Sequence, residues 1–174
     1  LFRSEQAGAL TDAIVARTWG AVTARPPAAP EGVEGWAIYT GLAGVAVLLL
    51  RRARAVAATA AADLATAAAI IEACDDAAAA EEAAAVARRS RHGPNVTFLM
   101  GRPGLWAVGA AIAVARGKSD VADEYGGRVA AFGGSDALLR APSLPCEVLY
   151  GRAGYLAAAA YTNAALGRVV VPPA

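Results

Sequence analysis

The sequence predicts an all-α fold built from helical hairpins. Alanine supplies most of a composition that is 57% hydrophobic but only 6% aromatic, and alanine is the best helix former. Runs of β-branched residues are few, and a G-x-x-G motif occurs three times before apolar, helix-forming segments. At this length we expect a single domain over residues 1–174 that is large enough for a real core.

The predicted helices follow one another along the chain with glycine and proline between them. The first lies within residues 1–22, where apolar residues recur at helical spacing, and a proline-rich segment ends it. The run Val96–Phe98 begins like a strand but is interrupted by glycine. The other predicted helices cover residues 36–54, 55–90 (one long helix or two abutting ones), 103–116, 120–132 and 147–166.

The three G-x-x-G motifs start 60 and 50 residues apart, and a more charged amphipathic segment separates successive copies. A repeat of this length indicates an array of supersecondary units that bury their faces against one another. We therefore predict hairpins with a charged outer helix and an apolar inner helix. Closed in a ring, such hairpins form an α/α toroid, a helical barrel, and about three hairpins here make an incomplete arc. Glycine at the start of an inner helix permits a sharp turn and close approach of neighbouring helix ends. These structural glycines are Gly41, Gly44, Gly101, Gly104, Gly151 and Gly154.

Other uses of a G-x-x-G motif fit this chain less well. A phosphate-binding loop needs a preceding strand and, in P-loops, a Lys-Ser/Thr pair after the glycines. A KH-type clamp needs a basic surface, whereas the formal net charge is +1, which also argues against nucleic acid as a partner. A membrane contact of the G-x-x-x-G type has a different spacing. The longest uncharged apolar run, Trp36–Leu50, falls short of the ~20 residues that span a bilayer, so we expect no transmembrane segment.

Three stretches resemble the lanthionine synthetase C-like (LanC-like) family, most closely its eukaryotic members: YTGLAGVAVLLL, VTFLMGRPGLWAVGAAIA and CEVLYGRAGYLAAAAYTNAALG. The similarity covers about residues 36–167, and LYGRAGYL is its most specific part. The resemblance implies an α/α toroid with a zinc ion at one end of the ring. It also implies a chemistry. In the bacterial cyclases, zinc activates a peptide cysteine thiol that adds to dehydroalanine or dehydrobutyrine to give a thioether. The eukaryotic relatives resemble glutathione binders that add glutathione to similar residues.

The sequence departs from the family at the metal site. The family's ligands are two cysteines and a histidine in W-C-x-G-like and C-H-G-like motifs, and neither motif occurs here. Cys74, Cys146 and His92 lack metal-ligand spacing, so we predict two buried, reduced thiols, a surface imidazole and no metal bound to this chain. Because the chain starts at Leu1 and ends in a linker-like segment, we expect a fragment whose family zinc ligands lie beyond Ala174.

Three residues are candidates for the family's site. Glu147 stands four residues before Gly151, at the offset of an acid proposed to transfer protons in the bacterial enzymes, and we mark it as catalytic. Its alternative role is a helix-start carboxylate favoured by the helix dipole. Arg102 and Arg152 share the second position of their motifs, and guanidiniums facing one opening would bind a carboxylate of glutathione or a phosphorylated peptide. Their alternative role is to cap or solvate exposed turns.

Two classes of function follow, and the sequence leaves both open. The first is part of a zinc-dependent enzyme for peptide modification, inactive as this fragment alone, with glutathione or a dehydrated peptide as partner. The second is a non-catalytic helical-repeat module that binds glutathione or peptide. Glycosidases share the toroid but need paired carboxylates, and only Glu147 stands near such a place. Two isolated cysteines without a secretory context indicate a cytoplasmic protein, and the resemblance implies peripheral plasma-membrane association in some members.

Overall fold

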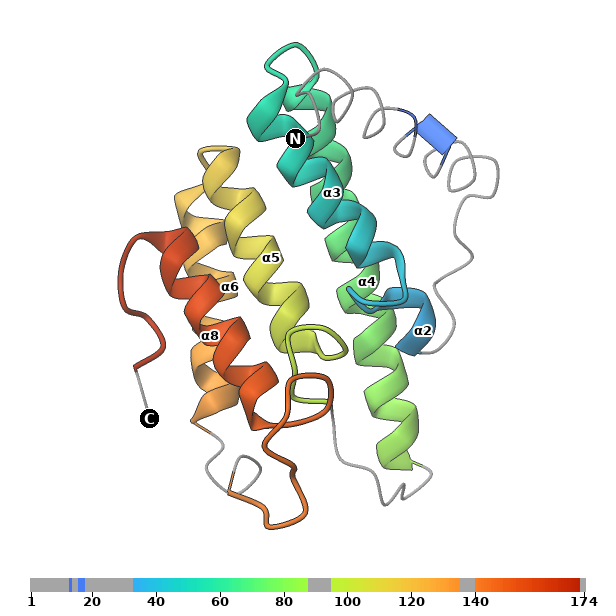
Figure 1. Cartoon of the computed structure of the whole chain (residues 1–174), viewed down its shortest axis with the longest axis vertical. Coiled ribbons are helices and arrows are strands. Elements are labelled where there is room, and N and C mark those ends of the chain that lie inside the picture. The colour runs from blue at the N-terminus through green and yellow to red at the C-terminus, as the bar shows by residue number, and fades with distance from the viewer. Residues whose placement is uncertain (1–12, 14–15, 18–32, 88–94, 135–139, 173–174) are drawn as a thin grey trace, which may run out of the picture.

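The computed structural model describes residues 13, 16–17, 33–87, 95–134 and 140–172. The regular elements in these ranges are all helices, which confirms the predicted all-α class (Figure 1). The helix predicted within residues 1–22 is described only at residues 13 and 16–17, which are helical. The elements are α2 (Val33–Trp36), α3 (Leu42–Ala55), α4 (Ala60–Ala87), α5 (Arg102–Ala115), α6 (Ser119–Gly133) and α8 (Arg152–Leu166).

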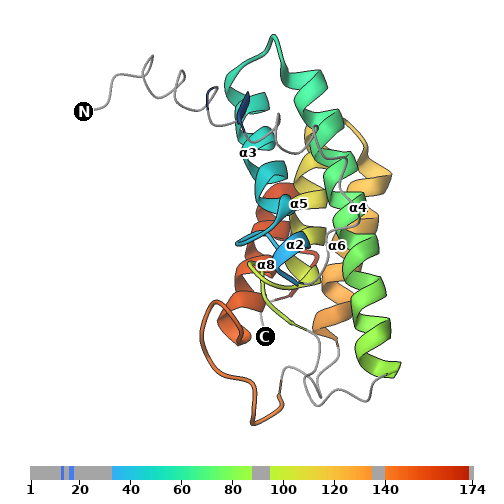
Figure 2. The same cartoon turned by 90° about the vertical axis from the view of Figure 1, so that its right-hand side faces the viewer.

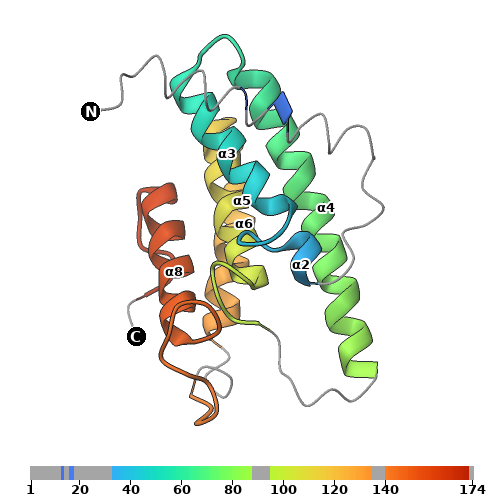
Figure 3. The ribbon, with the colours of Figure 1, turned by 45° about the vertical axis from the view of Figure 1, so that its right-hand side comes forward.

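The helices form two layers. Helix α3 pairs with α4, and α5 pairs with α6, as two hairpins joined by short turns, while α8 packs chiefly on α5. Figure 2 shows the layers edge-on, with α3 and α8 on one side and α4 on the other. In Figure 3, α5 lies between α8 and the α3–α4 pair. Helices α3, α5 and α8 are therefore the inner helices of an incomplete toroid, and α4 and α6 are the outer ones.

Helix α5 is the centre of the core. Its residues from Pro103 to Ala113 are all buried, because four other helices surround it. Leu105 and Ile112 of α5 share one apolar cluster with Leu50 and Ile71 of the first hairpin. A helix packed on so many sides needs small residues, and its sequence RPGLWAVGAAIAVA supplies them.

Helix α4 is a single helix of 28 residues, which settles the choice between one helix and two. Its buried residues recur at spacings of three and four, so that one stripe, apolar except for Asp63 and Asp75, faces the core. At its start it is held to α3 by Asp63, whose carboxylate accepts hydrogen bonds from Arg52 Nε at 2.8 Å and Nη2 at 2.5 Å. The outer helix is thus charged, as predicted, but two of its carboxylates, Asp63 and Asp75, are buried.

Two inner helices begin later than the sequence predicts. Helix α3 starts at Leu42 and α8 at Arg152, whereas residues 37–41 and 147–151 form turns. The strand-like start at Val96–Phe98 is wrong, because Val96 has no regular structure and residues 97–101 form the matching turn before α5. The predicted helix ends at residues 116 and 166 agree with α5 and α8 to within one residue, and Gly117 (φ 70°) and Gly167 (φ 65°) adopt the left-handed conformation just after them. None of the helices in the described ranges is long and apolar enough to cross a membrane.

Candidate functional site

The three turns before the inner helices lie in a row and bond to one another. The middle turn is at the centre, since the carbonyl oxygen of Leu99 accepts hydrogen bonds from the backbone N–H groups of Ile38 and Tyr39 in the first turn, both at 3.1 Å. On its other side, Phe98 N donates to the carbonyl of Gly154 at 3.0 Å. Figure 1 shows these loops at the same end of the inner helices. The three G-x-x-G motifs therefore build one continuous rim.

The motif positions require glycine because a side chain would not fit there, and not because the backbone adopts a conformation that only glycine tolerates. The first glycine of each motif is the N-cap of its helix, with φ between −120° and −128°, which any residue can adopt. A Cβ atom there would meet the backbone of the residue six positions earlier, and the second glycine of each motif has the same relationship. The distance to that carbonyl oxygen would be 2.5 Å for Gly41 and Gly44, and less at Gly101, Gly104, Gly151 and Gly154. Each turn therefore folds back onto its own helix start. Gly154 also meets Thr97 of the neighbouring turn, as the close approach of helix ends predicts.

Glu147 closes the third turn. Its carboxylate accepts hydrogen bonds from the backbone N–H groups of Leu149, at 2.7 Å, and of Tyr150. Thr97 holds the same position of the second motif, and its hydroxyl accepts from Met100 N at 3.1 Å while donating to the carbonyl of Leu149 at 2.8 Å. Aligning the motifs in the sequence shows that Thr97 and Glu147 each stand four residues before the first glycine, so this equivalence was predictable. Glu147 therefore has a structural role in the turn, and its proton-transfer role stays a prediction.

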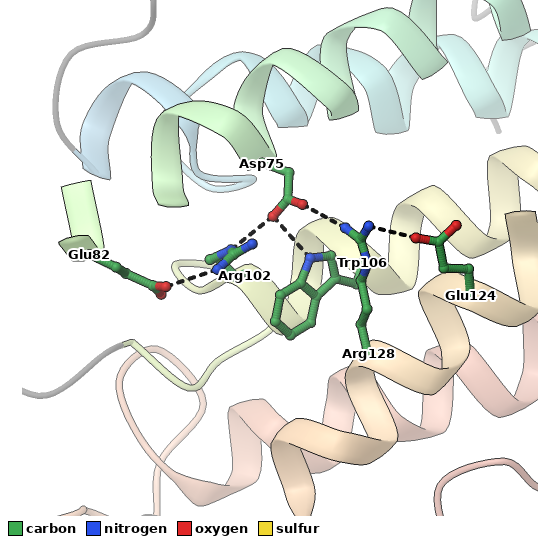
Figure 4. A network of polar contacts seen from close by, with 6 residues as sticks. All are labelled: Asp75, Glu82, Arg102, Trp106, Glu124 and Arg128. Atoms are coloured by element: carbon green, nitrogen blue, oxygen red, sulfur yellow. Dashed lines mark hydrogen bonds and ion pairs between the residues drawn. The ribbon is translucent and has the colours of Figure 1, made fainter. Parts of the chain in front are cut away.

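Arg102 points toward the outer helix α4. Its Nε donates to Asp75 at 2.8 Å and its Nη1 to Glu82 at 3.0 Å, and its guanidinium lies 4.8 Å from the centre of the Trp106 ring. Burial by itself would lower the pKa of Arg102, but the hydrogen bonds and charges of the two carboxylates outweigh it and raise the pKa. The guanidinium is thus held in an internal network (Figure 4).

Arg152 has a different environment, although it occupies the same motif position. Its Nη2 donates to the carbonyl of Ala141 at 2.7 Å, and its Nη1 donates to the Cys146 sulfur at 3.2 Å. It fastens the loop before α8 to the helix start. The structure therefore gives the two arginines separate partners within the chain, and their predicted role in substrate binding stays a prediction.

Asp75, the centre of the network in Figure 4, is not among the residues predicted from the sequence. This carboxylate is 8% exposed and accepts hydrogen bonds from Arg102, from Trp106 Nε1 at 2.9 Å and from Arg128 Nη1 at 2.9 Å. It joins α4 to both helices of the next hairpin. One signal was available, because Arg102 and Trp106 stand four residues apart and therefore share one face of α5.

The family comparison agrees with this geometry. The family model for lanthionine synthetase C-like protein matches residues 32–169, a span that includes all three G-x-x-G motifs. The chain belongs to the lanthionine synthetase C-like family. The resemblance drawn from the three quoted stretches is thereby confirmed, and the helices form a partial arc of the LanC-like toroid.

The described residues of this LanC-like chain do not fit the family's zinc ion. Cys74 is fully buried, and burial, more than any other cause, raises the pKa of its thiol to about 12. Cys146 lies in the exposed loop before α8, so the prediction that it is buried is wrong. His92 lies outside the described residues. Within the described ranges, no three Cys, His, Asp or Glu side chains are grouped so that they could hold a metal ion.

Proposed function

We propose that this LanC-like chain supplies the rim of a site at which a thiol adds to a dehydrated peptide. The thiol is a peptide cysteine or glutathione, and the acceptor is dehydroalanine or dehydrobutyrine. The observation that carries the proposal is the continuous row of three G-x-x-G turns inside the family match. None of the three inner helices has an acidic residue in its first turn, and the positive end of a helix dipole suits an anionic ligand.

In the proposed reaction the thiol loses one proton and the α-carbon of the acceptor peptide gains one. A thiolate sulfur forms a bond to the β-carbon of the dehydrated residue, the double-bond electrons move toward the α-carbon and carbonyl, and the α-carbon then takes a proton. No oxidant is consumed. Glu147 is our candidate for the proton carrier, because two backbone N–H groups fix its carboxylate at the rim and proton transfer demands a positioned group.

We propose further that these 174 residues do not activate the thiol by themselves. A thiol near its ordinary pKa of about 8.5 is mostly protonated at neutral pH. The described donors do not form the family's metal site, and Cys74 is too deeply buried to bind a metal or react. We therefore expect the chain to hold the frame and the proton carrier, and to depend on residues outside it for the thiolate.

The test has a chemical arm and a binding arm. In the first, the purified chain is incubated with glutathione and a dehydroalanine peptide, the thioether is measured by mass spectrometry, and bound zinc by elemental analysis. We expect no product above the buffer blank and much less than one zinc per chain. Product formation, or one tightly bound zinc per chain, would contradict the proposed dependence on other residues.

In the binding arm, amide signals of the isotope-labelled chain are followed while glutathione or the dehydrated peptide is added. We expect shifts at the turns 37–41, 97–101 and 147–151, and weaker shifts in a Glu147→Gln variant only for the residues of the third turn. Glu124→Gln, an exposed change on α6, is the matched control. Shifts confined to other surfaces would contradict the proposal. Binding with micromolar affinity in the absence of metal would favour the alternative, a non-catalytic glutathione- or peptide-binding module.

A further inference from the structure

A cavity of about 240 Å³ opens between α4, α5 and α6, away from the G-x-x-G rim. It lies along the second half of α5, from Gly109 to Ala113, and reaches Arg116 just after that helix, whereas the rim lies at the start of α5. Its floor is apolar, because Ile71 of α4 and Ile112 and Ala113 of α5 line it and all three are buried. An apolar floor in a concave site is what small-molecule pockets generally have.

The inner end of the cavity is closed by Tyr125. Its ring lies flat against Gly109, where an added Cβ atom would be 2.9 Å from two ring atoms. One turn farther along both outer helices, Arg128 donates to Asp75 at 2.9 Å, and residues three apart on a helix are neighbours on its surface. The ion pair therefore lies one helical turn beyond the ring, outside the lining of the cavity, whereas Arg116 and Lys118 line the opposite end, at the turn between α5 and α6.

The polar groups of the cavity are divided between its two ends. Arg116 and Lys118 stand at the open end, both exposed, and neither side chain forms an ion pair or side-chain hydrogen bond with another residue in the described ranges. Glu72 stands on the Tyr125 side. Burial raises the pKa of Tyr125, and the charges of Glu72 and Asp75 raise it further, so its hydroxyl is a neutral hydrogen-bond donor at pH 7. One end of the cavity is thus cationic and the other is anionic.

We propose that this cavity binds a small zwitterion with an apolar body, either a free apolar amino acid or an apolar dipeptide. The carboxylate pairs with Arg116 and Lys118, the ammonium faces Glu72, and the apolar side chain lies on Ile71 and Ile112. The volume is below the 300–1,000 Å³ that holds drug-sized ligands, which limits the ligand to a few residues at most. Gly109 and Arg116 are seven positions apart, about 10 Å along the helix axis. This length suits the separated termini of an extended dipeptide, at ~3.5 Å per residue, better than the adjacent charges of a free amino acid.

The first experiment measures binding to the whole chain by titration calorimetry. The ligands are L-leucine, L-leucyl-L-leucine, and two single-charge analogues of leucine, 4-methylpentanoate and 3-methylbutylamine. We expect one of the two zwitterions to bind at least about tenfold more tightly than either analogue, since each charge-assisted contact contributes that much. Whichever of leucine and dileucine binds more tightly shows whether the cavity takes a free amino acid or a dipeptide. Equal affinity of all four ligands, or binding of none, overturns the proposal.

Variants then separate the two ends of the cavity. The double change Arg116→Ala with Lys118→Ala should weaken the preferred zwitterion about tenfold or more, and Glu72→Gln should weaken it while strengthening 4-methylpentanoate. Ala68→Leu fills the cavity and should abolish binding of every ligand. Arg51→Ala, an exposed arginine of α3 outside the cavity, is the control, and helical circular dichroism confirms folding. Unchanged zwitterion affinity in both charge variants overturns the proposal.

Discussion

Arg102 donates to Asp75 at 2.8 Å across the boundary between the two hairpins. The contact places a motif residue of an inner helix against the outer helix of the preceding hairpin (Figure 4). Trp106 and Arg128 donate to the same carboxylate, so three donors from the second hairpin converge on one buried acid of the first. This carboxylate fixes how successive hairpins of the arc are placed against each other.

Replacing Asp75 by asparagine should destabilise the chain by about 3 kcal/mol, because removal of one charge from a buried network leaves the remaining charges uncompensated. The measurement is urea unfolding followed by circular dichroism at pH 7. Asp76→Asn is the matched control, since Asp76 is the exposed neighbour on the same helix and should change the free energy of unfolding by less than about 0.5 kcal/mol. Equal effects at the two positions would show that the network contributes little.

Gly101 of the second motif and Gly127 inside α6 should respond in opposite ways to the same substitution. Gly101→Ala should cost about 2–3 kcal/mol, because its Cβ would overlap the carbonyl oxygen of Asn95 in a backbone that cannot shift freely. Gly127→Ala should stabilise by about 0.5–1 kcal/mol, because this glycine is inside α6 and the added Cβ would have no atom within 4 Å apart from the local backbone of its own helix. Thermal unfolding checks both, since about 1 kcal/mol moves the midpoint by about 2–4 °C in a chain of this size. A stable Gly101→Ala variant would contradict the overlap.

The repeat let the sequence predict the hairpins and the order of inner and outer helices. The ends of α5 and α8 were predictable because glycine follows each of them. Gly117 and Gly167 adopt the left-handed conformation that few other residues tolerate. The starts of α3 and α8 were not predictable in the same way. Alanine, tyrosine and leucine in the preceding turns are compatible with helix, and the turns are held by contacts between separate motifs, such as Ile38 with Leu99.

The Asp75 network could not be predicted from the sequence, for a related reason. Its donors lie 27, 31 and 53 residues away along the chain, and in an alanine-rich helix the neighbouring aspartates 75 and 76 look alike. Only the rotation of α4 against α5 decides which one is buried. Cys146 was misplaced because its exposure is set by the path of a proline-containing loop and not by local periodicity.

The two cysteines should differ sharply in reactivity. Cys146 is exposed, whereas Cys74 is buried with its pKa raised to about 12, and only a thiolate reacts readily. At pH 8, a thiol reagent such as Ellman's should modify one cysteine rapidly in the folded chain and the second only in denaturant. Mass mapping identifies the fast site, and Cys146→Ser should remove the fast phase. Rapid modification of Cys74 in the folded chain would mean that α4 opens on the timescale of the assay.

The ion pair between Arg52 and Asp63 should give the first hairpin an acid-sensitive part of its stability. The hydrogen bond from Arg52 is the main cause that lowers the pKa of Asp63 below its usual 3.8, and burial of the carboxylate works against it. Because the folded pKa is lowered, the stabilisation is fully present above the unfolded value and is lost as the pH falls through the folded one.

Asp63→Asn should therefore cost about 2 kcal/mol at pH 7, the usual loss for a hydrogen bond to a charged group, and progressively less below pH 3.8. Urea unfolding of the wild-type chain and the variant at a series of pH values between these limits measures the difference. Glu124→Gln is the control, because Glu124 forms an exposed pair with Arg128 and such pairs contribute little at any pH. A difference between wild type and Asp63→Asn that stays constant down to the lowest pH at which both fold would show that the carboxylate's charge is not what joins α3 to α4.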